Sequence, residues 1–430
     1  TPLLKVALAT GAVVALYGAA ERLGIDKHLW VQDVQNRVFS SLGQPNWLAA
    51  YIVALSPIAW AFAQQIQNSK FKIQNYVWSA VSVLFFLVLL FTRSRSGLLG
   101  FAVTDVVFWS LIFLTRADLV TPKQKSSYAE KASPFQAKPT IPFLILHAVF
   151  FLIVFFNGSH VDSIDRWFTF NAWKNRLTKI AVQQAPLATP SAAPTAIVTT
   201  PRLESGGTES GTIRKYVWQG AIAAWRSSVK TFLIGTGTET FAFAFFQYRP
   251  AGHNMTTEWD YLYNKAHNEY LNYLATTGIF GLGSYLLFIG VLVRWFGKQH
   301  QCVNVSMRQR KNADASDAFD ALTPALFSGW LSILVTNFFG FSVVIVQLFL
   351  FLFPAMSIAL LSPGVQPLQW RIPTSLFRFI SLAILLVLLV LFAFLILLSR
   401  MWYADTLFAS GYRLARVNQY AQAQPLILDA

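Results

Sequence analysis

Charged side chains are scarce in this chain of 430 residues, since Asp, Glu, Lys and Arg together make up only 12% of it. A soluble domain usually carries about 25% charged residues, so the composition excludes a single water-soluble globular domain. The chain has one cysteine, Cys302, which excludes an intramolecular disulfide and any zinc site built from several cysteines. The chain starts at Thr1 without a signal-peptide pattern, and we therefore expect a segment of a longer protein.

Hydrophobic residues make up 55% of the chain and gather in long uninterrupted runs. A helix that crosses the hydrocarbon core of a bilayer needs about 20 mostly apolar residues. None of the runs shows the period-two alternation of a barrel wall, so the sequence predicts an all-α, polytopic membrane helix bundle of about nine spans. The nine segments are Leu3–Ala19, Trp47–Ala63, Tyr76–Thr92, Gly97–Leu114, Ile141–Phe156, Gly278–Phe296, Ala325–Phe339, Val343–Leu361 and Leu376–Leu398.

The net charge of +15 would suggest nucleic-acid binding in a soluble protein. In a membrane protein Lys and Arg instead set the orientation, so we expect the lipid bilayer as a partner and no nucleic acid. The short connections 64–75, 116–140, 297–323 and 362–375 are basic, and they fall on one side if nine spans alternate. The positive-inside rule makes that side cytoplasmic, which places the long loop 157–277 and the C-terminal tail outside the cytoplasm.

The sequence divides into four regions. Residues 1–156 and 278–398 hold the N-terminal and C-terminal membrane helices, and 157–277 forms the large outer loop. Within this loop, 181–212 is rich in Ala, Pro, Thr and Ser and is expected to be a disordered insert. Apolar residues then recur at helical spacing over 213–224 and 239–248, which predicts amphipathic helices that roof the bundle.

The tail 400–430 changes in character. Its apolar and small residues follow the spacing at the start of a tetratricopeptide-like repeat. One repeat cannot bury its own apolar face, so further repeats and a protein partner are expected for this region. An ordinary amphipathic helix is the alternative.

His267 is the most informative of the six histidines. The run 266–271 leads directly into the sixth span, so we expect His267 at the outer membrane surface, on a short helix fixed by the bundle. A neutral imidazole there can accept a proton from an alcohol near pH 7. The alternative is that His267 and Asn268 merely cap this helix.

Basic residues of the outer side form two groups. Arg93 and Arg95 stand in a short turn between two spans, where they can bind a phosphate attached to a lipid; anchoring at the lipid surface is the alternative. A second group could complete a cationic cup for a pyrophosphate, and the turn Gly235–Gly237 could add backbone N–H donors. Solvated charges and a plain turn are the alternatives here. The second group consists of Arg214, Lys215, Arg226, Lys230 and Arg249.

No pair of histidines or carboxylates has the spacing of a metal site, and we expect neither a metal nor another cofactor. Asp105 lies in the middle of a span and should face the bundle interior. Pairing with a hydroxyl or an amide is favoured for it over a role in proton transfer. His147, inside another apolar span, is expected to be a satisfied core histidine.

Four stretches together resemble the O-antigen ligase/polymerase family, which are membrane glycosyltransferases that use polyprenyl-pyrophosphate-linked glycans. The resemblance covers about residues 30–360 and implies catalytic roles for Arg95, Arg214 and His267. Many members have an acidic residue just before the histidine, where Asn264 and Lys265 stand here. Further donor contacts are expected from Arg93, Lys215, Arg249 and Asn268. The four stretches are Phe39–Leu48, Thr92–Gly97, Arg214–Phe241 and His267–Leu271 with Gly278 and Gly281.

The resemblance implies a metal-independent enzyme of the bacterial cytoplasmic (inner) membrane. It would transfer a glycan from the lipid-linked donor to an acceptor hydroxyl at the outer face, as in lipopolysaccharide biosynthesis. A polymerase of polysaccharide repeat units and a protein O-oligosaccharyltransferase are alternatives within the family. A transporter or flippase of lipid-linked sugars is the alternative from a different class, and it would not need His267.

Overall fold

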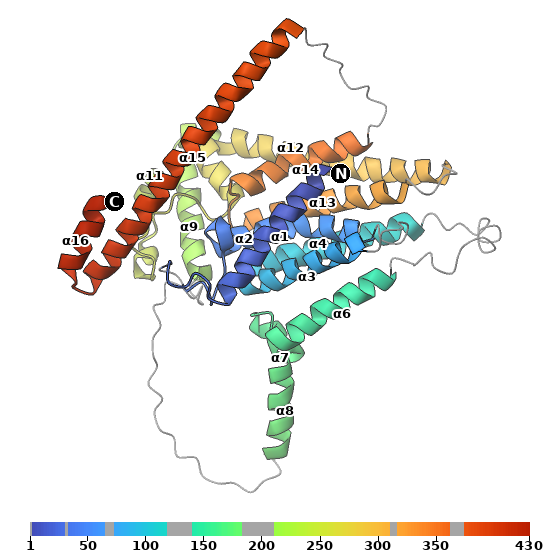
Figure 1. The fold of residues 1–430 in the computed structure, drawn as a ribbon, viewed down its shortest axis with the longest axis horizontal. Coiled ribbons are helices and arrows are strands. Elements are labelled where there is room, and N and C mark those ends of the chain that lie inside the picture. Colours follow the sequence, from blue (N-terminus) through green and yellow to red (C-terminus); the bar gives the residue numbers. More distant parts are fainter. Residues whose placement is uncertain are drawn as a thin grey trace. The chain divides into compact units, whose positions relative to one another are not determined.

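The computed structural model describes residues 2–30, 33–64, 73–117, 140–182, 210–309, 316–361 and 374–430. Every regular element within these ranges is helical (Figure 1), which confirms the predicted all-α bundle. The chain divides into two units, Thr1–Pro363 and Gly364–Ala430. The expected insert 181–212 lies almost entirely outside the described residues.

All nine predicted spans lie on helices. In the described residues, seven helices have the length and apolar character of a membrane span. Helix α3 (Ile73–Thr92) is apolar over a shorter stretch, and α6 (Thr140–Asn157) reaches the required length only together with α7 (Asp162–Phe168), from which it is bent by 99°. The seven are α1 (Pro2–Arg22), α2 (Pro45–Gln64), α4 (Arg95–Ala117), α12 (Glu269–Gln309), α13 (Ser316–Phe338), α14 (Val344–Leu361) and α15 (Thr374–Arg416).

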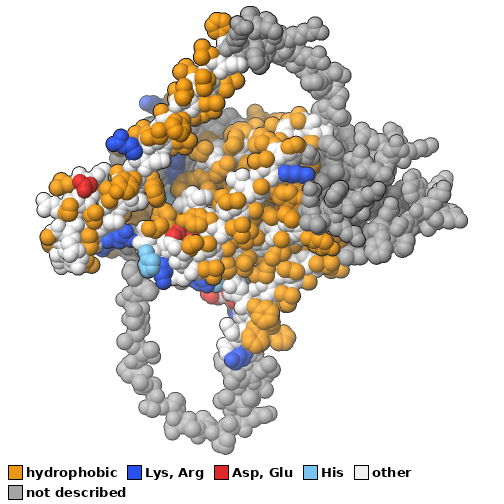
Figure 2. Space-filling model, viewed as in Figure 1, with side chains coloured by type: hydrophobic (Ala, Val, Ile, Leu, Met, Phe, Trp, Pro, Cys, Tyr) orange, Lys and Arg blue, Asp and Glu red, His pale blue; other side chains and the backbone are white. Residues whose placement is uncertain are grey.

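Helix α2 forms the centre of the first unit, where it packs against α1, α3, α4, α13 and α14 (Figure 1). A small residue lets α13 approach it closely, because a Cβ added to Gly329 would lie 2.4 Å from the carbonyl oxygen of Ala54. Trp60 and Trp330 fill much of the remaining interior and are almost completely buried. Hydrophobic side chains cover most of the bundle surface visible in Figure 2, as expected for helices that contact lipid.

Helix α6 is joined to the bundle by a polar pair. Nε2 of His147 lies 3.0 Å from Oδ2 of Asp105 on α4, and Nδ1 lies 2.8 Å from the carbonyl oxygen of Phe143. His147 is therefore satisfied by its neighbours, as expected. The expectation of a hydroxyl or amide partner for Asp105 was wrong, because α6 places an imidazole beside it.

The part of the loop 157–277 that begins at Ser210 folds into short helices at the end of the bundle where α12 begins (Figure 1). The two predicted amphipathic helices are confirmed as α9 (Ser210–Trp225) and α11 (Phe241–Tyr248), and α10 (Val229–Ile234) lies between them in sequence. These helices share a small hydrophobic core with the residues that lead into α12. Its buried members are Ile213, Val217, Ala221, Phe241, Phe245, Tyr263, Ala266 and Ala275.

The second unit consists of α15 and α16 (Tyr420–Asp429). Helix α15 runs unbroken past Arg400 to Arg416, so the change in composition at Arg400 does not coincide with a helix end. A turn at Asn418 leads back into α16, and Gly411 faces Ile427 at close range. This pair of helices has the form of one helix–turn–helix, and the tetratricopeptide-like repeat stays a prediction.

Candidate functional site

The connection between α1 and α2 carries Arg37, which the sequence did not single out. The buried carboxylate of Glu21 accepts hydrogen bonds from the backbone N–H groups of Phe39 and Ser40, at 2.9 and 2.7 Å. Arg37 donates from Nε to the carbonyl oxygen of Thr92 at 3.1 Å. The connection is therefore held against the C-terminal end of α3, where carbonyl groups lack partners within the helix.

Arg93 directly follows Thr92, so the predicted cationic turn lies beside Arg37. The backbone φ of Arg93 is 50°, in the left-handed region that non-glycine residues rarely adopt. The turn is fixed by Ser94, whose hydroxyl donates to Oδ1 of Asn46 at 2.7 Å. Burial lowers the pKa of the Arg93 guanidinium. Backbone strain held in place in this way is common at functional sites.

Arg214 reaches the same region from α9. Its neighbours Ile213 and Val217 are buried in the core of the outer helices, and its own side chain is partly buried. Burial lowers the pKa of Arg37, and the positive charges of Arg93 and Arg214 lower it further. Arg93 and Arg214 therefore both lie close enough to Arg37 for their charges to act on its guanidinium, and the three residues are called the arginine cluster below.

None of these three arginines forms an ion pair with a carboxylate among the described residues, although the charge of Asp33 acts on Arg93 and that of Glu258 acts on Arg214. The ion pairs found there join Lys265 with Glu239 and His147 with Asp105. Partly buried charges of one sign are unfavourable unless they are compensated. A bound polyanion would compensate all three, and a guanidinium matches the oxygen geometry of a phosphate.

His267 lies beside this arginine cluster, in the connection that leads into α12, where its φ is 52°. The sequence suggested a short helix at this position, but the structure places His267 outside any helix. Burial, and secondly the charge of Arg214, lower the pKa of its imidazole to about 4. The ring is therefore neutral at pH 7 and able to accept a proton. Tyr263 and Phe341 contact it edge-on, with ring centroids 5.6 and 5.4 Å away.

Asn268 caps helix α12. Its Oδ1 accepts a hydrogen bond from the N–H of Leu271 at 3.0 Å, as an N-cap side chain does. Its own carbonyl accepts from Asn272 at 2.8 Å, and the residue is 2% exposed. The capping alternative therefore applies to Asn268. A contact between Asn268 and the substrate stays a prediction.

The turn Gly235–Gly237 does not offer its backbone N–H groups to a ligand. The N–H groups of Thr236 and Gly237 donate to the carbonyl oxygens of Ala275 and Thr276 at 3.0 and 2.9 Å, and that of Gly235 donates within α10. The alternative of a plain turn therefore applies, and these donors do not contribute to an anion site. The turn instead docks the outer helices onto α12.

Arg249 belongs to a neighbouring group. It donates from Nε and Nη2 to Nδ1 of the buried His253 at 3.0 and 2.8 Å. The ring of His253 lies 5.3 Å from that of Tyr263, centroid to centroid, and Tyr263 also contacts His267. Arg249 is therefore linked to the site through two aromatic rings.

Arg95 and Lys215 have exposed side chains, at the start of α4 and on α9. The structure groups Arg93, rather than Arg95, with Arg37 and Arg214, and roles for Arg95 and Lys215 stay predictions. Arg226 and Lys230 are also exposed. Among the described residues, no three His, Cys, Asp or Glu side chains lie close enough to hold a metal ion.

These features define a polytopic helical membrane protein with a cationic site at one end of its bundle. Residues 80–286 match the family model of the O-antigen ligase, which confirms the resemblance, and this part of the chain is an O-antigen ligase domain. The match contains Arg93, Arg214 and His267, whereas Arg37 precedes it. No curated protein and no solved structure matches the chain. The family implies a multi-pass membrane enzyme that transfers glycosyl groups from a lipid-linked glycan.

Proposed function

We propose that this protein transfers a glycan from a polyprenyl-pyrophosphate donor to an acceptor hydroxyl, at the outer face of the bacterial cytoplasmic membrane and without a metal ion. The grouping of Arg37, Arg93 and Arg214, none of which forms an ion pair among the described residues, beside the neutral His267 carries the proposal. The family match supports the reaction class.

The arginine cluster binds the pyrophosphate, and His267 acts as the general base. The imidazole takes the proton of the acceptor hydroxyl while its oxygen attacks the anomeric carbon. The bond from that carbon to the phosphate oxygen breaks, and the pyrophosphate leaves with the electron pair. Guanidinium groups that neutralise the charge growing on the leaving group supply the main electrostatic stabilisation.

Donor binding prepares the base. In the unoccupied site, the charge of Arg214 helps to hold the pKa of His267 near 4, so the imidazole is a weak base. A bound pyrophosphate opposes that positive charge and therefore raises the pKa toward the range in which general bases work well. The catalytic group is thus strengthened when the donor is in place.

The exposed Lys215 and the His253-bound Arg249 are assigned to donor binding around this centre, as the sequence predicts. Arg95, for which the family resemblance implies a catalytic role, is assigned to donor binding with them. Arg37 joins them as a residue that the structure adds. The acceptor approaches from the side of His267, where the described residues supply no hydrogen-bond partner for either ring nitrogen.

The purified protein in lipid nanodiscs tests this function directly. It is incubated with an undecaprenyl-pyrophosphate-linked glycan and, separately, with a lipid-A core, a second lipid-linked glycan and a protein acceptor. Transfer to any of them supports the proposal and identifies the subclass, and one displacement predicts inversion at the anomeric carbon. Translocation of the intact donor without transfer would show a transporter instead.

A further inference from the structure

Glu258 is a carboxylate beside the candidate site that the proposed chemistry does not use. It lies in the connection between the short helical segment η3 (Ala251–Met255) and α12, and its side chain is half-buried. Its Oε2 accepts a hydrogen bond from the hydroxyl of Tyr263. Among the described residues, Oε1 has neither a hydrogen bond nor an ion pair. One oxygen of the carboxylate is thus held by the fold and the other is free.

Glu258 is close to both parts of the site. The ring of Tyr263, whose hydroxyl holds Glu258, is 6% exposed and lies edge-on to the ring of His267 at a centroid distance of 5.6 Å. Burial lowers the pKa of the Arg214 guanidinium, and the charge of Glu258 opposes this effect. The N–H of Tyr261 donates to the carbonyl oxygen of Glu258 at 3.2 Å, which closes a turn over residues 258–261. The carboxylate is therefore fixed beside the base and the arginine cluster.

A free carboxylate at this place does not serve the pyrophosphate. Its negative charge repels an anion bound at Arg214, and it forms no ion pair with that arginine. An ionised carboxylate accepts hydrogen bonds and donates none, so a hydroxyl group is a partner that suits it. A sugar ring carries several hydroxyls on neighbouring carbons. One of them can bind to Oε1 of Glu258 while another lies at His267.

The same turn presents an indole. Trp259 is 58% exposed and contacts no other aromatic ring among the described residues. A sugar ring has an apolar face of C–H groups, against which a Trp ring can pack. Anchoring at the lipid surface is the alternative for an exposed Trp. Asp260 is exposed beside it in the turn, and a carboxylate is costly to bury in lipid, which favours a carbohydrate as the partner.

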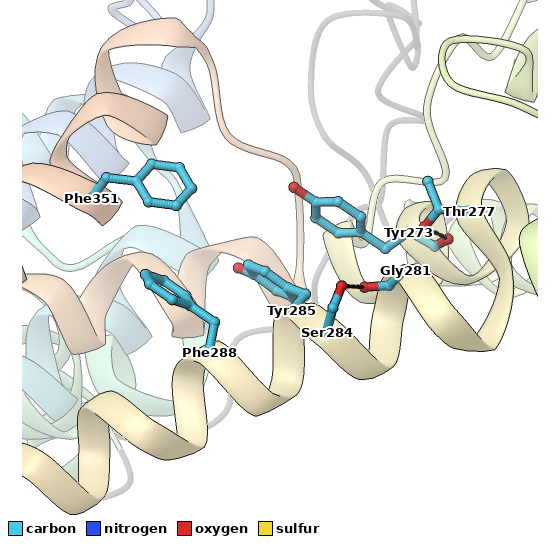
Figure 3. A pocket seen from close by; sticks show the side chains of 7 residues that line it. All are labelled: Tyr273, Thr277, Gly281, Ser284, Tyr285, Phe288 and Phe351. Carbon is cyan, nitrogen blue, oxygen red and sulfur yellow. Dashed lines mark hydrogen bonds between the residues drawn. The ribbon is translucent and has the colours of Figure 1, made fainter.

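The groove on α12 lacks this combination of side chains. It is bounded by Phe351 of α14, and the described residues that line it include no charged side chain (Figure 3). The hydroxyl of Thr277 donates to the carbonyl oxygen of Tyr273 at 2.6 Å, and that of Ser284 donates to the carbonyl oxygen of Gly281 at 2.9 Å (Figure 3). These two hydroxyls are thus used within the helix. The turn 258–261 is the better match for a sugar.

We propose that the turn 258–261 binds the sugar ring that carries the acceptor hydroxyl. Glu258 accepts a hydrogen bond from a neighbouring hydroxyl of that ring, and Trp259 packs against its apolar face. This assignment rests on the function proposed above and adds that the acceptor is a carbohydrate rather than a protein. A ring held at two points keeps its reactive hydroxyl at the imidazole, and such positioning raises the rate of the reaction.

Glu258→Gln tests the carboxylate. The carbonyl oxygen of the amide can still accept from Tyr263, but the amide NH₂ group replaces the free oxygen and cannot accept a hydrogen bond. With a lipid-A core or a second lipid-linked glycan as acceptor, we expect the KM of the acceptor to rise roughly tenfold. Inorganic pyrophosphate should bind as tightly or more tightly, because a negative charge is removed. Asp260→Asn, in the same turn, is the matched control and should change neither quantity.

Trp259→Ala tests the indole in the same assay. It should raise the KM of the sugar acceptor roughly tenfold, and Trp259→Phe should restore most of the loss because a ring is kept. Trp402→Ala removes a Trp of similar exposure, 64%, from the second unit and should leave the KM unchanged. Equal effects of Trp259→Ala and Trp402→Ala would contradict a sugar contact at Trp259.

Four other outcomes decide between this assignment and its alternatives. An unchanged acceptor KM in Glu258→Gln would overturn it, and so would weaker binding of inorganic pyrophosphate, since Glu258 would then only position Arg214. If Glu258→Gln weakens the undecaprenyl-pyrophosphate-linked glycan but not undecaprenyl pyrophosphate alone, the turn binds a donor sugar instead. Transfer to the protein acceptor alone would refute a carbohydrate acceptor and leave the proposed function standing. Failure of the unmodified protein to transfer to any of the three acceptors would refute the proposed function itself.

Discussion

Arg37 donates from Nε to the carbonyl oxygen of Thr92 at 3.1 Å, which ties the first connection of the chain to the turn that carries Arg93. Its two Nη groups have no hydrogen-bond partner among the described residues. One edge of the guanidinium is thus anchored by the fold while the other can meet an anion. Such an arrangement suits bidentate binding of phosphate.

The anchored guanidinium makes Arg37→Lys a costly substitution although the charge is kept. An ammonium cannot bond to Thr92 and to a phosphate in the same fixed geometry. We expect glycan transfer to fall by roughly tenfold to a hundredfold, in line with the loss of one charge-assisted hydrogen bond of about 1.5–3 kcal/mol. Transfer rates of the purified variant measure this effect. Arg226→Lys, an exposed arginine over the ring of Trp225, is the matched control and should be neutral.

Arg93 and Arg95 give a second comparison within one turn. Arg93 is partly buried beside Arg37, whereas Arg95 is exposed. We expect Arg93→Lys to reduce donor affinity more than Arg95→Lys, by about tenfold or more. Titration of each variant with undecaprenyl pyrophosphate makes the measurement. The reverse order would restore the role that the family resemblance implies for Arg95.

The helical fold could be predicted from the sequence, because a long apolar segment in a bilayer can satisfy its backbone hydrogen bonds in few structures. Every predicted span lies on a helix. Arg214 and His267 could also be proposed as site residues from the sequence, because they stand next to recognisable patterns. Arg37 was missed because its role depends on a contact 55 positions away, with Thr92. One signal was available: Arg37 lies in a short outer connection, where a positive charge runs against the positive-inside rule just as Arg93 does.

The same dependence on distant contacts explains the errors. Gly235–Gly237 has the composition of a phosphate-binding turn, but its N–H groups are used by carbonyls of α12, some 40 residues further on. Asp105 was assigned a neutral partner because the sequence does not show that α6 brings His147 against α4. Local composition predicts which groups a segment offers, and packing decides which of them remain available.

The docking of the outer helices predicts a stability effect at Gly235. A Cβ added there would lie 2.2 Å from the backbone of Thr276, and the φ of Gly235 is 72°. Gly235→Ala should therefore lower the free energy of unfolding by at least about 1–3 kcal/mol and reduce transfer, because α9 would shift with Arg214. Gly211→Ala, where a Cβ meets nothing within 4 Å, should be neutral or slightly stabilising. Thermal unfolding of both variants in nanodiscs tests the difference.

The lowered pKa of His267 predicts a specific pH dependence. Its folded pKa of about 4 lies below the usual 6.5, so the free enzyme keeps a neutral base as the pH falls to about 5. The acidic limb of kcat/KM should therefore lie near pH 4, and that of kcat, which reports the donor complex, at higher pH. Arg214→Ala should move the limb of kcat/KM upward, because it removes a positive charge. Identical limbs for kcat and kcat/KM would argue against pyrophosphate binding beside the imidazole.

The lowered pKa of His267 also predicts how the stability of the fold depends on pH. The unfolded chain takes up a proton on this histidine near pH 6.5, before the folded protein does at about 4. His267 therefore lowers the stability of the fold as the pH falls from about 6.5 toward 4. His267→Gln should reduce that loss, measured as a smaller drop in unfolding temperature between pH 7 and pH 5. An unchanged drop would mean that the imidazole titrates normally in the folded protein.

His267→Ala and Asn268→Ala separate catalysis from helix capping at adjacent positions. The base contacts the acceptor and not the pyrophosphate, so His267→Ala should fold and bind undecaprenyl pyrophosphate normally. Its transfer rate should fall by roughly 10²-fold or more, about 2.7 kcal/mol of transition-state stabilisation.

Asn268→Ala removes the acceptor for the N–H of Leu271 and should cost about 1 kcal/mol of stability, with activity falling only as the folded fraction falls. Donor binding, unfolding temperature and transfer, measured on the same preparations, give a distinct pattern for each variant. Full transfer by a folded His267→Ala variant would end the assignment of this histidine as the base, whereas translocation of the intact donor without any transfer would favour the transporter.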